Sequence, residues 1–202
     1  MNRQWSLMVR RFKMTNISVF ASGNGTNFEK IMNYIEVGYF KNIHVTSVVT
    51  DKVDAGVIER AKKYDVPVHI ISPKDFRNKR QYEVHILTIM RKEQVEWIVL
   101  AGYMRLITSV LLNAFDRKIL NIHPSLLPSF PGKDAIGQAL DYGVKVTGAT
   151  VHYVDSGMDT GEIIAQSSCV IHDDDTKDTL QLRVQNLEYE IYPQTIKQLI
   201  DQ

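Results

Sequence analysis

The chain has 202 residues, which is room for one large domain, since domains average ~150 residues. Hydrophobic residues make up 44% and charged residues 23%, so the chain can bury a core and is neither disordered nor fibrous. Lys+Arg 24 against Asp+Glu 23 leave a net charge of +1. This balance excludes the strong basic field expected of a protein that wraps nucleic acid.

The sequence contains no apolar run near the ~18 residues that would span a bilayer, and no apolar stretch typical of a secretory signal. We therefore predict a cytoplasmic protein with no membrane and no nucleic-acid partner. The single cysteine, Cys169, lies in an apolar stretch and is interpreted as a small buried hydrophobic residue.

The first fifteen residues carry four cations, Arg3, Arg10, Arg11 and Lys13, and no acid. We interpret residues 1–15 as a disordered basic extension and residues 16–202 as a single catalytic domain. An arm that binds nucleic acid or a membrane is the alternative, but four charges without a hydrophobic stripe anchor weakly.

The first part of the domain alternates between apolar runs typical of strands and segments with helical periodicity. Strands are predicted at 17–21, 45–50, 68–71, 97–101 and 119–122. Helices are predicted at 28–37, 55–64, 82–92 and 109–115. In the third of these helices, Val84, Leu87 and Ile89 are the expected apolar residues. Strands separated by helices predict right-handed crossovers and a parallel sheet with helices on both faces.

The pattern changes after Pro131. The apolar runs 146–154 and 163–171 are joined by eight residues, too few for a crossover helix, so this pair should be antiparallel. Residues 176–200 form the last predicted helix, which Pro193 should kink or interrupt. The predicted fold is a Rossmann-like, doubly wound α/β domain, with a mostly parallel sheet and a C-terminal antiparallel hairpin.

The glycine-rich segment 22–27, Ser-Gly-Asn-Gly-Thr-Asn, follows the first predicted strand and opens a helix. One interpretation of this segment is a phosphate-binding loop, because free N–H groups at a helix start can bind an anion. The alternative interpretation is an ordinary turn with Thr26 or Asn27 as N-cap. Phe28 stands where a dinucleotide fingerprint has its third glycine. Asp51, at the end of the second strand, could still act as a ribose-binding acid, so an NAD enzyme remains an alternative.

Asn121 and His123 lie in a predicted strand that Pro124 ends. Because side chains alternate along a strand, the amide and the imidazole should face the same crevice, while Ile122 faces the core. Ligands of open α/β sheets bind beyond the carboxyl ends of the strands. This pair is therefore a candidate for acid–base or oxyanion chemistry.

Asp159 lies between two glycines in the loop that joins the last two strands. One interpretation is a simple turn former. The other is a carboxylate that folds over the crevice, reaches His123 and favours its charged imidazolium form. Asn121, His123 and Asp159 would then stabilise an acyl-transfer oxyanion. No nucleophile elbow occurs, which favours direct transfer between two substrates. Residues 173–175, Asp-Asp-Asp, suit the start of the last helix, with a magnesium site as the alternative.

Four motifs, at 22–27, 100–105, 120–128 and 157–161, resemble those of the phosphoribosylglycinamide formyltransferase family, from about Asn16 to Lys197. The Asn-Ile-His-Pro-Ser-Leu-Leu-Pro stretch at 121–128 is shared by folate-dependent formyltransferases. The resemblance implies the formyltransferase fold and transfer of a formyl group from 10-formyltetrahydrofolate to glycinamide ribonucleotide in purine biosynthesis. It implies no metal.

The resemblance also implies roles for individual residues. Asn121 would donate to the formyl oxygen, His123 would steady the tetrahedral intermediate or move its protons, and Asp159 would hold His123. The residues expected to bind the ribonucleotide are Gly25, Thr26, Asn27, Gln185 and Glu188. Those expected to bind the folate are Arg105, Leu106, Ile107, Asn121, Asp155 and Met158.

Segment 132–135 differs from its histidine-bearing counterpart in some relatives, and no role is assigned to it. Other members of the superfamily are alternatives: a formyltetrahydrofolate deformylase, with a similar glycine loop, and a methionyl-tRNA formyltransferase. A nonenzymatic nucleotide-binding module would leave Asn121, His123 and Asp159 unexplained. The expected state is a monomer or a homodimer.

Overall fold

The computed structural model describes residues 13–201. Residues 1–12, which include most of the extension predicted to be disordered, lie outside the described residues, as does residue 202. Thr15, which we assigned to that extension, is already part of the first strand, and its N–H donates to the carbonyl of Asn42 at 2.6 Å.

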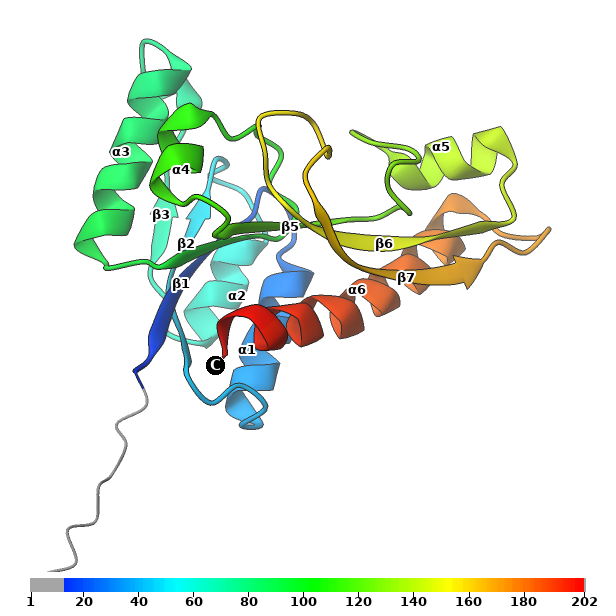
Figure 1. Ribbon diagram of the computed structural model, residues 1–202, viewed down its shortest axis with the longest axis horizontal. Coiled ribbons are helices and arrows are strands. Elements are labelled where there is room, and N and C mark those ends of the chain that lie inside the picture. The colour runs from blue at the N-terminus through cyan, green and yellow to red at the C-terminus, as the bar shows by residue number, and fades with distance from the viewer. Residues whose placement is uncertain (1–12, 202) are drawn as a thin grey trace, which may run out of the picture.

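One sheet forms the centre of the described residues, and Figure 1 shows helices above and below it. Its strands are β1 (Thr15–Phe20), β2 (Ile43–Thr50), β3 (Val68–Ile70), β4 (Trp97–Leu100), β5 (Ile119–His123), β6 (Val146–Tyr153) and β7 (Ile163–Val170). The α-helices are α1 (Thr26–Glu36), α2 (Val57–Lys63), α3 (Lys79–Lys92), α4 (Ser109–Ala114), α5 (Ala135–Tyr142) and α6 (Lys177–Ile200). A 3₁₀ turn covers Pro73–Asp75.

The strand order β3-β2-β1-β4-β5-β6-β7 decides where a ligand can bind. Strands β1 to β5 are parallel, and β6 and β7 add as an antiparallel hairpin, as the short connection predicted. The chain runs from β1 outward to β2 and β3, and then returns to the other side of β1 as β4. Loops leaving β1 and β4 therefore diverge, which opens a crevice at the carboxyl ends of these strands.

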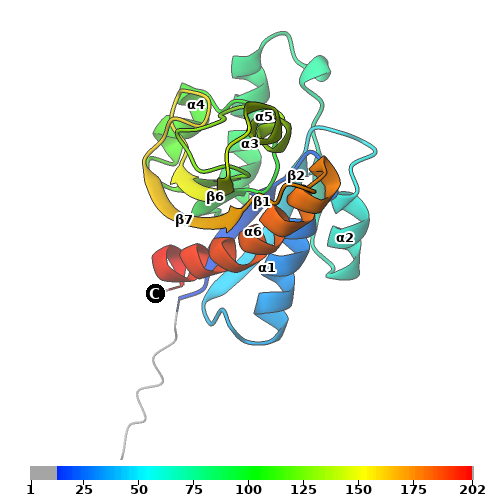
Figure 2. The same ribbon diagram turned by 90° about the vertical axis from the view of Figure 1, so that its right-hand side faces the viewer.

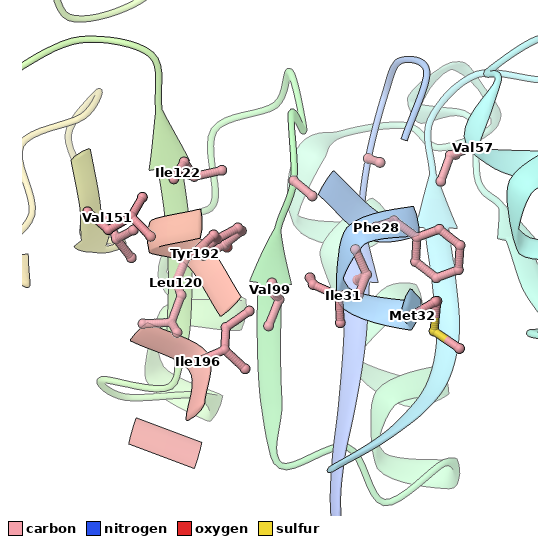
Figure 3. Close-up of a cluster of buried hydrophobic side chains, with 14 of the residues drawn as sticks. Phe28, Ile31, Met32, Val57, Val99, Leu120, Ile122, Val151, Tyr192 and Ile196 are labelled. Carbon is pink, nitrogen blue, oxygen red and sulfur yellow. The ribbon is translucent and has the colours of Figure 1, made fainter. Parts of the chain in front are cut away.

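Two buried clusters cover the two faces of the sheet. The larger contains residues of α1, α2, α5 and α6, and Figure 3 shows Tyr192 and Ile196 of α6 beside Val99 and Leu120 of the sheet. The second cluster contains residues of α3 and α4. The view in Figure 2 shows α1 and α6 on the same side of the sheet. Burial of apolar area on both faces is the main stabilisation of this fold.

Helix α3 differs from its prediction in its buried face. It begins at Lys79, three residues earlier than expected, because the Asn78 side chain accepts the Gln81 N–H at 2.9 Å. Glu83, Ile86 and Met90 face the core, whereas the expected core residue Val84 is 47% exposed. The other two expected apolar residues, Leu87 and Ile89, are partly buried against the second cluster, so the prediction is wrong only for Val84.

The structure of the C-terminal part differs from the sequence prediction in two helices. Helix α5 was not predicted, since it is short and buries little beyond Ala135, Ile136 and Ala139. Helix α6 runs through Pro193 without interruption. The neighbouring residue Tyr192 is fully buried, and its hydroxyl donates to the carbonyls of Leu100 and Leu120, so tertiary packing holds α6 against the sheet at the proline. No helix of residues 13–201 is both long and apolar enough to cross a membrane.

Candidate active site

A cavity of about 350 Å³ lies at the carboxyl ends of β4 and β5, and the hairpin loop after β6 contributes to its wall. The sheet end contributes Asn121 and His123, and β6 contributes His152. Residues 102–107 form one side of the cavity, and residues 132–134 and 155–159 form another. Asn27 of α1 and Glu188 of α6 also line it. The crevice expected from the topology is therefore present and is lined by polar groups from distant segments.

Asn121 is held by a second histidine that the sequence did not single out. Asn121 and His152 are partners in the β5–β6 ladder, and Asn121 Nδ2 lies 3.1 Å from His152 Nε2. His152 Nδ1 donates to the Tyr153 carbonyl at 2.8 Å, which leaves Nε2 as the acceptor. Burial lowers the pKa of His152 and so favours the neutral ring that this pattern requires. A neutral imidazole thus orients the Asn121 amide.

His123 has acceptors facing both of its ring nitrogens. Nε2 lies 2.9 Å from the Phe130 carbonyl, and Nδ1 lies 3.4 Å from Asp159 Oδ2. A carbonyl and a carboxylate can only accept hydrogen bonds, so the doubly protonated ring satisfies both contacts. The side chain of His123 is 6% exposed, so solvent would screen a charge on this ring only weakly.

Asp159 connects the members of this group. Its Oδ2 accepts the Gly132 N–H at 2.7 Å, and its Oδ1 lies 3.4 Å from Asn121 Nδ2 and 3.7 Å from His152 Nε2. Asp159 therefore touches both histidines and the amide, although it comes from a loop 38 residues further along the chain than Asn121. We refer to Asn121, His123, His152 and Asp159 as the polar cluster.

The hairpin loop that carries Asp159 is held by its own contacts. Asp155 Oδ1 accepts the Gly157 N–H at 3.0 Å and the Thr160 hydroxyl at 2.8 Å. Gly161 allows the strands to approach, because a Cβ there would lie 1.7 Å from the Tyr153 carbonyl oxygen. Asp159 adopts a left-handed φ of 56° in this loop, and its carboxylate contacts Asn121 and His123 of β5.

The glycine loop, residues 22–27, ends at the start of α1. Gly25 is the N-cap, with φ 74°, and no side chain caps this helix, so the predicted alternative in which Thr26 or Asn27 is the N-cap is wrong. A Cβ on Gly25 would lie 2.5 Å from Val57. The first N–H groups of α1 are thus free of side-chain caps, which suits an anion.

Asn27 and Glu188 connect the glycine loop to α6. Asn27 Nδ2 donates to Glu188 Oε2 at 2.9 Å, across 161 residues of sequence. Burial raises the pKa of Glu188 to about 7, against a smaller lowering by the Asn27 hydrogen bond. Glu188 lies one helical turn before the anchored Tyr192, so the packing of α6 under β4 and β5 brings this carboxyl group to the cavity.

The comparisons with known proteins agree with this geometry. A family model described as formyl transferase matches residues 15–196. A phosphoribosylglycinamide formyltransferase of Bacillus subtilis (strain 168) is 50% identical over 93% of this chain and 95% of its own. The chain belongs to the formyl transferase family. A crystal structure of a phosphoribosylglycinamide formyltransferase from Bacillus halodurans has a TM-score of 0.90 at 45% identity, covering 93% of this chain and 96% of that one.

A glycinamide ribonucleotide transformylase 1 from Geobacillus kaustophilus is similarly close in structure, with a TM-score of 0.89 at 49% identity. The alignment covers 93% of this chain and 99% of that chain. The predicted fold class, a mostly parallel doubly wound sheet with a C-terminal antiparallel hairpin, is thus confirmed both by the strand order and by solved members of the family.

Most of the residues singled out from the sequence meet at this one cavity. Its lining includes every residue predicted for catalysis or folate binding: Arg105, Leu106, Ile107, Asn121, His123, Asp155, Met158 and Asp159. Of the five residues predicted for the ribonucleotide, Asn27 and Glu188 line the cavity, whereas Gly25, Thr26 and Gln185 do not. Gly25 and Thr26 precede Asn27 directly, and Gln185 is half-buried on α6, one turn before Glu188.

Sequence reasoning missed two parts of the cavity. His152 was not among the predicted site residues, and only the β5–β6 register reveals that it is opposite Asn121. Segment 132–134 had no assigned role, yet it lines the cavity, and the Gly132 N–H holds Asp159. Neither a strand register nor a backbone donor leaves a signal in a single sequence.

Two of the three aspartates at 173–175 form ion pairs. Asp175 binds Arg183 through two contacts of 2.6 and 2.9 Å, and Asp173 binds Lys145 at 2.9 Å. Across residues 13–201, no group of three or more His, Cys, Asp and Glu side chains is arranged to hold a metal ion. The magnesium alternative therefore has no support in the described part of the chain.

Proposed function

We propose that this enzyme transfers the formyl group of 10-formyltetrahydrofolate to the amine of glycinamide ribonucleotide, giving formylglycinamide ribonucleotide and tetrahydrofolate in purine biosynthesis. The observation that carries the proposal is the convergence of Asn121, His123 and Asp159, with contacts of 3.4 Å from Asp159 to each of the other two. The formyl transferase family and a relative that is 50% identical to this chain support the same reaction.

The polar cluster suits a tetrahedral intermediate. The amine lone pair forms a bond to the formyl carbon, and the carbonyl π electrons move to oxygen, which becomes an oxyanion. Asn121 Nδ2 would donate to this oxygen in place of its longer contact, the one of 3.4 Å to Asp159. The shorter contact, to His152, would keep the amide oriented. If His123 is protonated, its positive charge would stabilise the oxyanion, because the buried side chain of His123 is little screened by solvent.

Completion of the reaction moves one proton. The oxyanion re-forms the carbonyl, and the bond from the formyl carbon to N10 of the folate breaks. The attacking nitrogen loses a proton and N10 gains one, so a group that can accept and return a proton is required. Asp159, which is 15% exposed, and its partner His123 are placed for this exchange, either directly or through a water molecule.

We assign the two substrates to opposite ends of the cavity. The phosphate of the ribonucleotide binds at the free N–H groups of Gly25, Thr26 and Asn27, and Gln185 and Glu188 approach it from α6. The folate binds along 105–107 and against the loop 155–159. In this assignment, the acceptor amine and the formyl donor meet at Asn121.

We further propose that residues 16–202 act as a single catalytic domain in the cytoplasm, preceded by a basic extension, and that the protein works as a monomer or a homodimer. Its partners are then the two small-molecule substrates. These assignments rest on the continuous sheet, on the net charge of +1 and on the family match across residues 15–196.

The test is to mix the purified protein with glycinamide ribonucleotide and 10-formyltetrahydrofolate and follow the folate absorbance. Tetrahydrofolate should appear only when both substrates are present, in equal amount to the formylated ribonucleotide. Release of tetrahydrofolate and formate without the ribonucleotide would contradict the proposal and identify a deformylase instead.

A further inference from the structure

Asp51 has no place in the mechanism above, although its carboxylate is almost completely buried. Its side chain is 1% exposed at the end of β2, and it does not line the cavity. One oxygen, Oδ2, accepts from Arg105 Nε at 2.7 Å, and the other, Oδ1, is buried without a hydrogen-bond partner. Burial disfavours the charged form of this carboxylate, whereas the Ser22 and Arg105 side chains favour it and hold the pKa of Asp51 below its ordinary value. A buried anion outside the reaction site calls for an explanation.

The Arg105 side chain contacts Asp51 and also lines the cavity. Its side chain is 47% exposed and lines the cavity, while its Nε faces the buried carboxylate. Within residues 13–201, neither of its two Nη groups has a hydrogen-bond partner. A guanidinium carries five donors in a rigid fork, so holding Nε sets the direction of the rest. The ion pair with Asp51 thereby restrains the guanidinium of a residue that lines the cavity.

The backbone around Arg105 is fastened from outside the cavity as well. The Met104 N–H donates to Ser22 Oγ at 2.9 Å, and the Ser22 N–H donates to the Gly102 carbonyl at 3.0 Å. The Thr108 N–H donates to the buried Glu83 at 2.8 Å. The backbone is thus held at 102, 104 and 108, and the ion pair with Asp51 restrains the long side chain of Arg105 between these points.

We propose that Asp51 is a positioning residue for the folate: it orders the Arg105 guanidinium before the co-substrate binds, so that its free donors meet the folate without first losing rotamer entropy. Asp51 is therefore not the ribose-binding acid considered from the sequence, because its carboxylate is buried and bound to Arg105. The inference rests on the proposed function, since it assigns the Arg105 side of the cavity to the folate.

The test compares Asp51→Ala, Arg105→Ala and the double variant in steady-state assays of both substrates. Asp51→Ala should raise KM for 10-formyltetrahydrofolate about tenfold, which corresponds to about 1.4 kcal/mol, and leave KM for glycinamide ribonucleotide unchanged. In the Arg105→Ala background, the same substitution should change KM for the folate by less than about twofold, because Asp51 acts through Arg105.

Asp51→Asn serves as a second variant that keeps the shape and one acceptor for Nε but loses the charge, and it should show a smaller rise in the same KM. It decides the question if Asp51→Ala does not fold. Asp201→Asn is the matched control: Asp201 is also 1% exposed and binds Lys197 at 3.0 Å, in a region remote from the cavity lining. It should lower Tm and leave both KM values unchanged.

Equal effects of Asp51→Ala in both backgrounds, or a parallel rise in both KM values, would show a merely structural role and overturn the inference. Those results, obtained while the wild-type protein turns over both substrates, would leave the proposed function intact. Absence of turnover by the wild-type protein would overturn the proposed function and this inference with it.

Discussion

The polar cluster and the glycine loop meet at the same cavity, but they are built differently. The polar cluster consists of side chains from three segments that contact one another, with Asp159 touching Asn121, His123 and His152. The glycine loop offers backbone N–H groups at a helix start without a side-chain cap. The polar cluster therefore acts through the chemistry of its side chains, whereas the glycine loop acts through the shape of its backbone. Substitutions should therefore affect turnover at the first and substrate affinity or stability at the second.

The largest effect should come from the polar cluster. Asn121→Ala removes the donor to the oxyanion and should lower kcat by roughly 10²- to 10³-fold with little change in either KM. Asn113→Ala, at an exposed position of α4, is the control and should keep normal kcat. A kcat within threefold of wild type for Asn121→Ala would remove Asn121 from the mechanism.

A glycine substitution tests whether the loop depends on backbone shape. Gly25→Ala places a Cβ 2.5 Å from Val57 at φ 74°, so unfolding free energy should fall by roughly 2 to 4 kcal/mol. Gly38→Ala has a similar φ of 70° but open space around it, so it isolates the backbone strain and should cost only about 1 kcal/mol. Equal losses in urea unfolding would show that the contact with Val57 is unimportant.

Glu188 should make stability depend on pH. Its pKa is about 7 in the folded protein against 4.5 ordinarily, so folding favours the protonated form. Stability should therefore fall as pH rises from about 4.5 to about 7 and then level off. Glu188→Gln stays neutral and should exceed the wild type by roughly 1 to 3 kcal/mol at pH 8, but match it near pH 4.5.

Urea unfolding at the two pH values measures this difference. Glu190→Gln, at an exposed position of the same helix, is the control and should behave like the wild type at both. A Glu188→Gln variant no more stable than the wild type at pH 8 would show that burial does not favour the neutral carboxyl group.

The smallest effect should come from the side chain of Asn27. Asn27→Ala should raise KM for glycinamide ribonucleotide about fivefold, because it removes the hydrogen bond to Glu188 but leaves the backbone N–H groups in place. The folate KM and kcat should change little. A rise in the folate KM of the same size would contradict the assignment of the two substrates to opposite ends of the cavity.

Sequence patterns alone predicted most of the elements, although not α5, and the class of fold. Alternating strands and helices predicted the parallel sheet, and the eight-residue connection predicted the antiparallel hairpin. Alternation along a strand predicted that Asn121 and His123 share a side, and both line the cavity. These inferences succeeded because they depend on local periodicity and chain length, which short-range sterics decide.

Tertiary structure alone decided which distant groups meet. The β5–β6 register places His152 opposite Asn121, the packing of Tyr192 brings Glu188 to Asn27, and the core selects Glu83 and Ile86 instead of Val84 as the buried face of α3. Such contacts join residues up to 161 positions apart. They depend on how the whole chain buries its apolar surface, and no local pattern records that outcome.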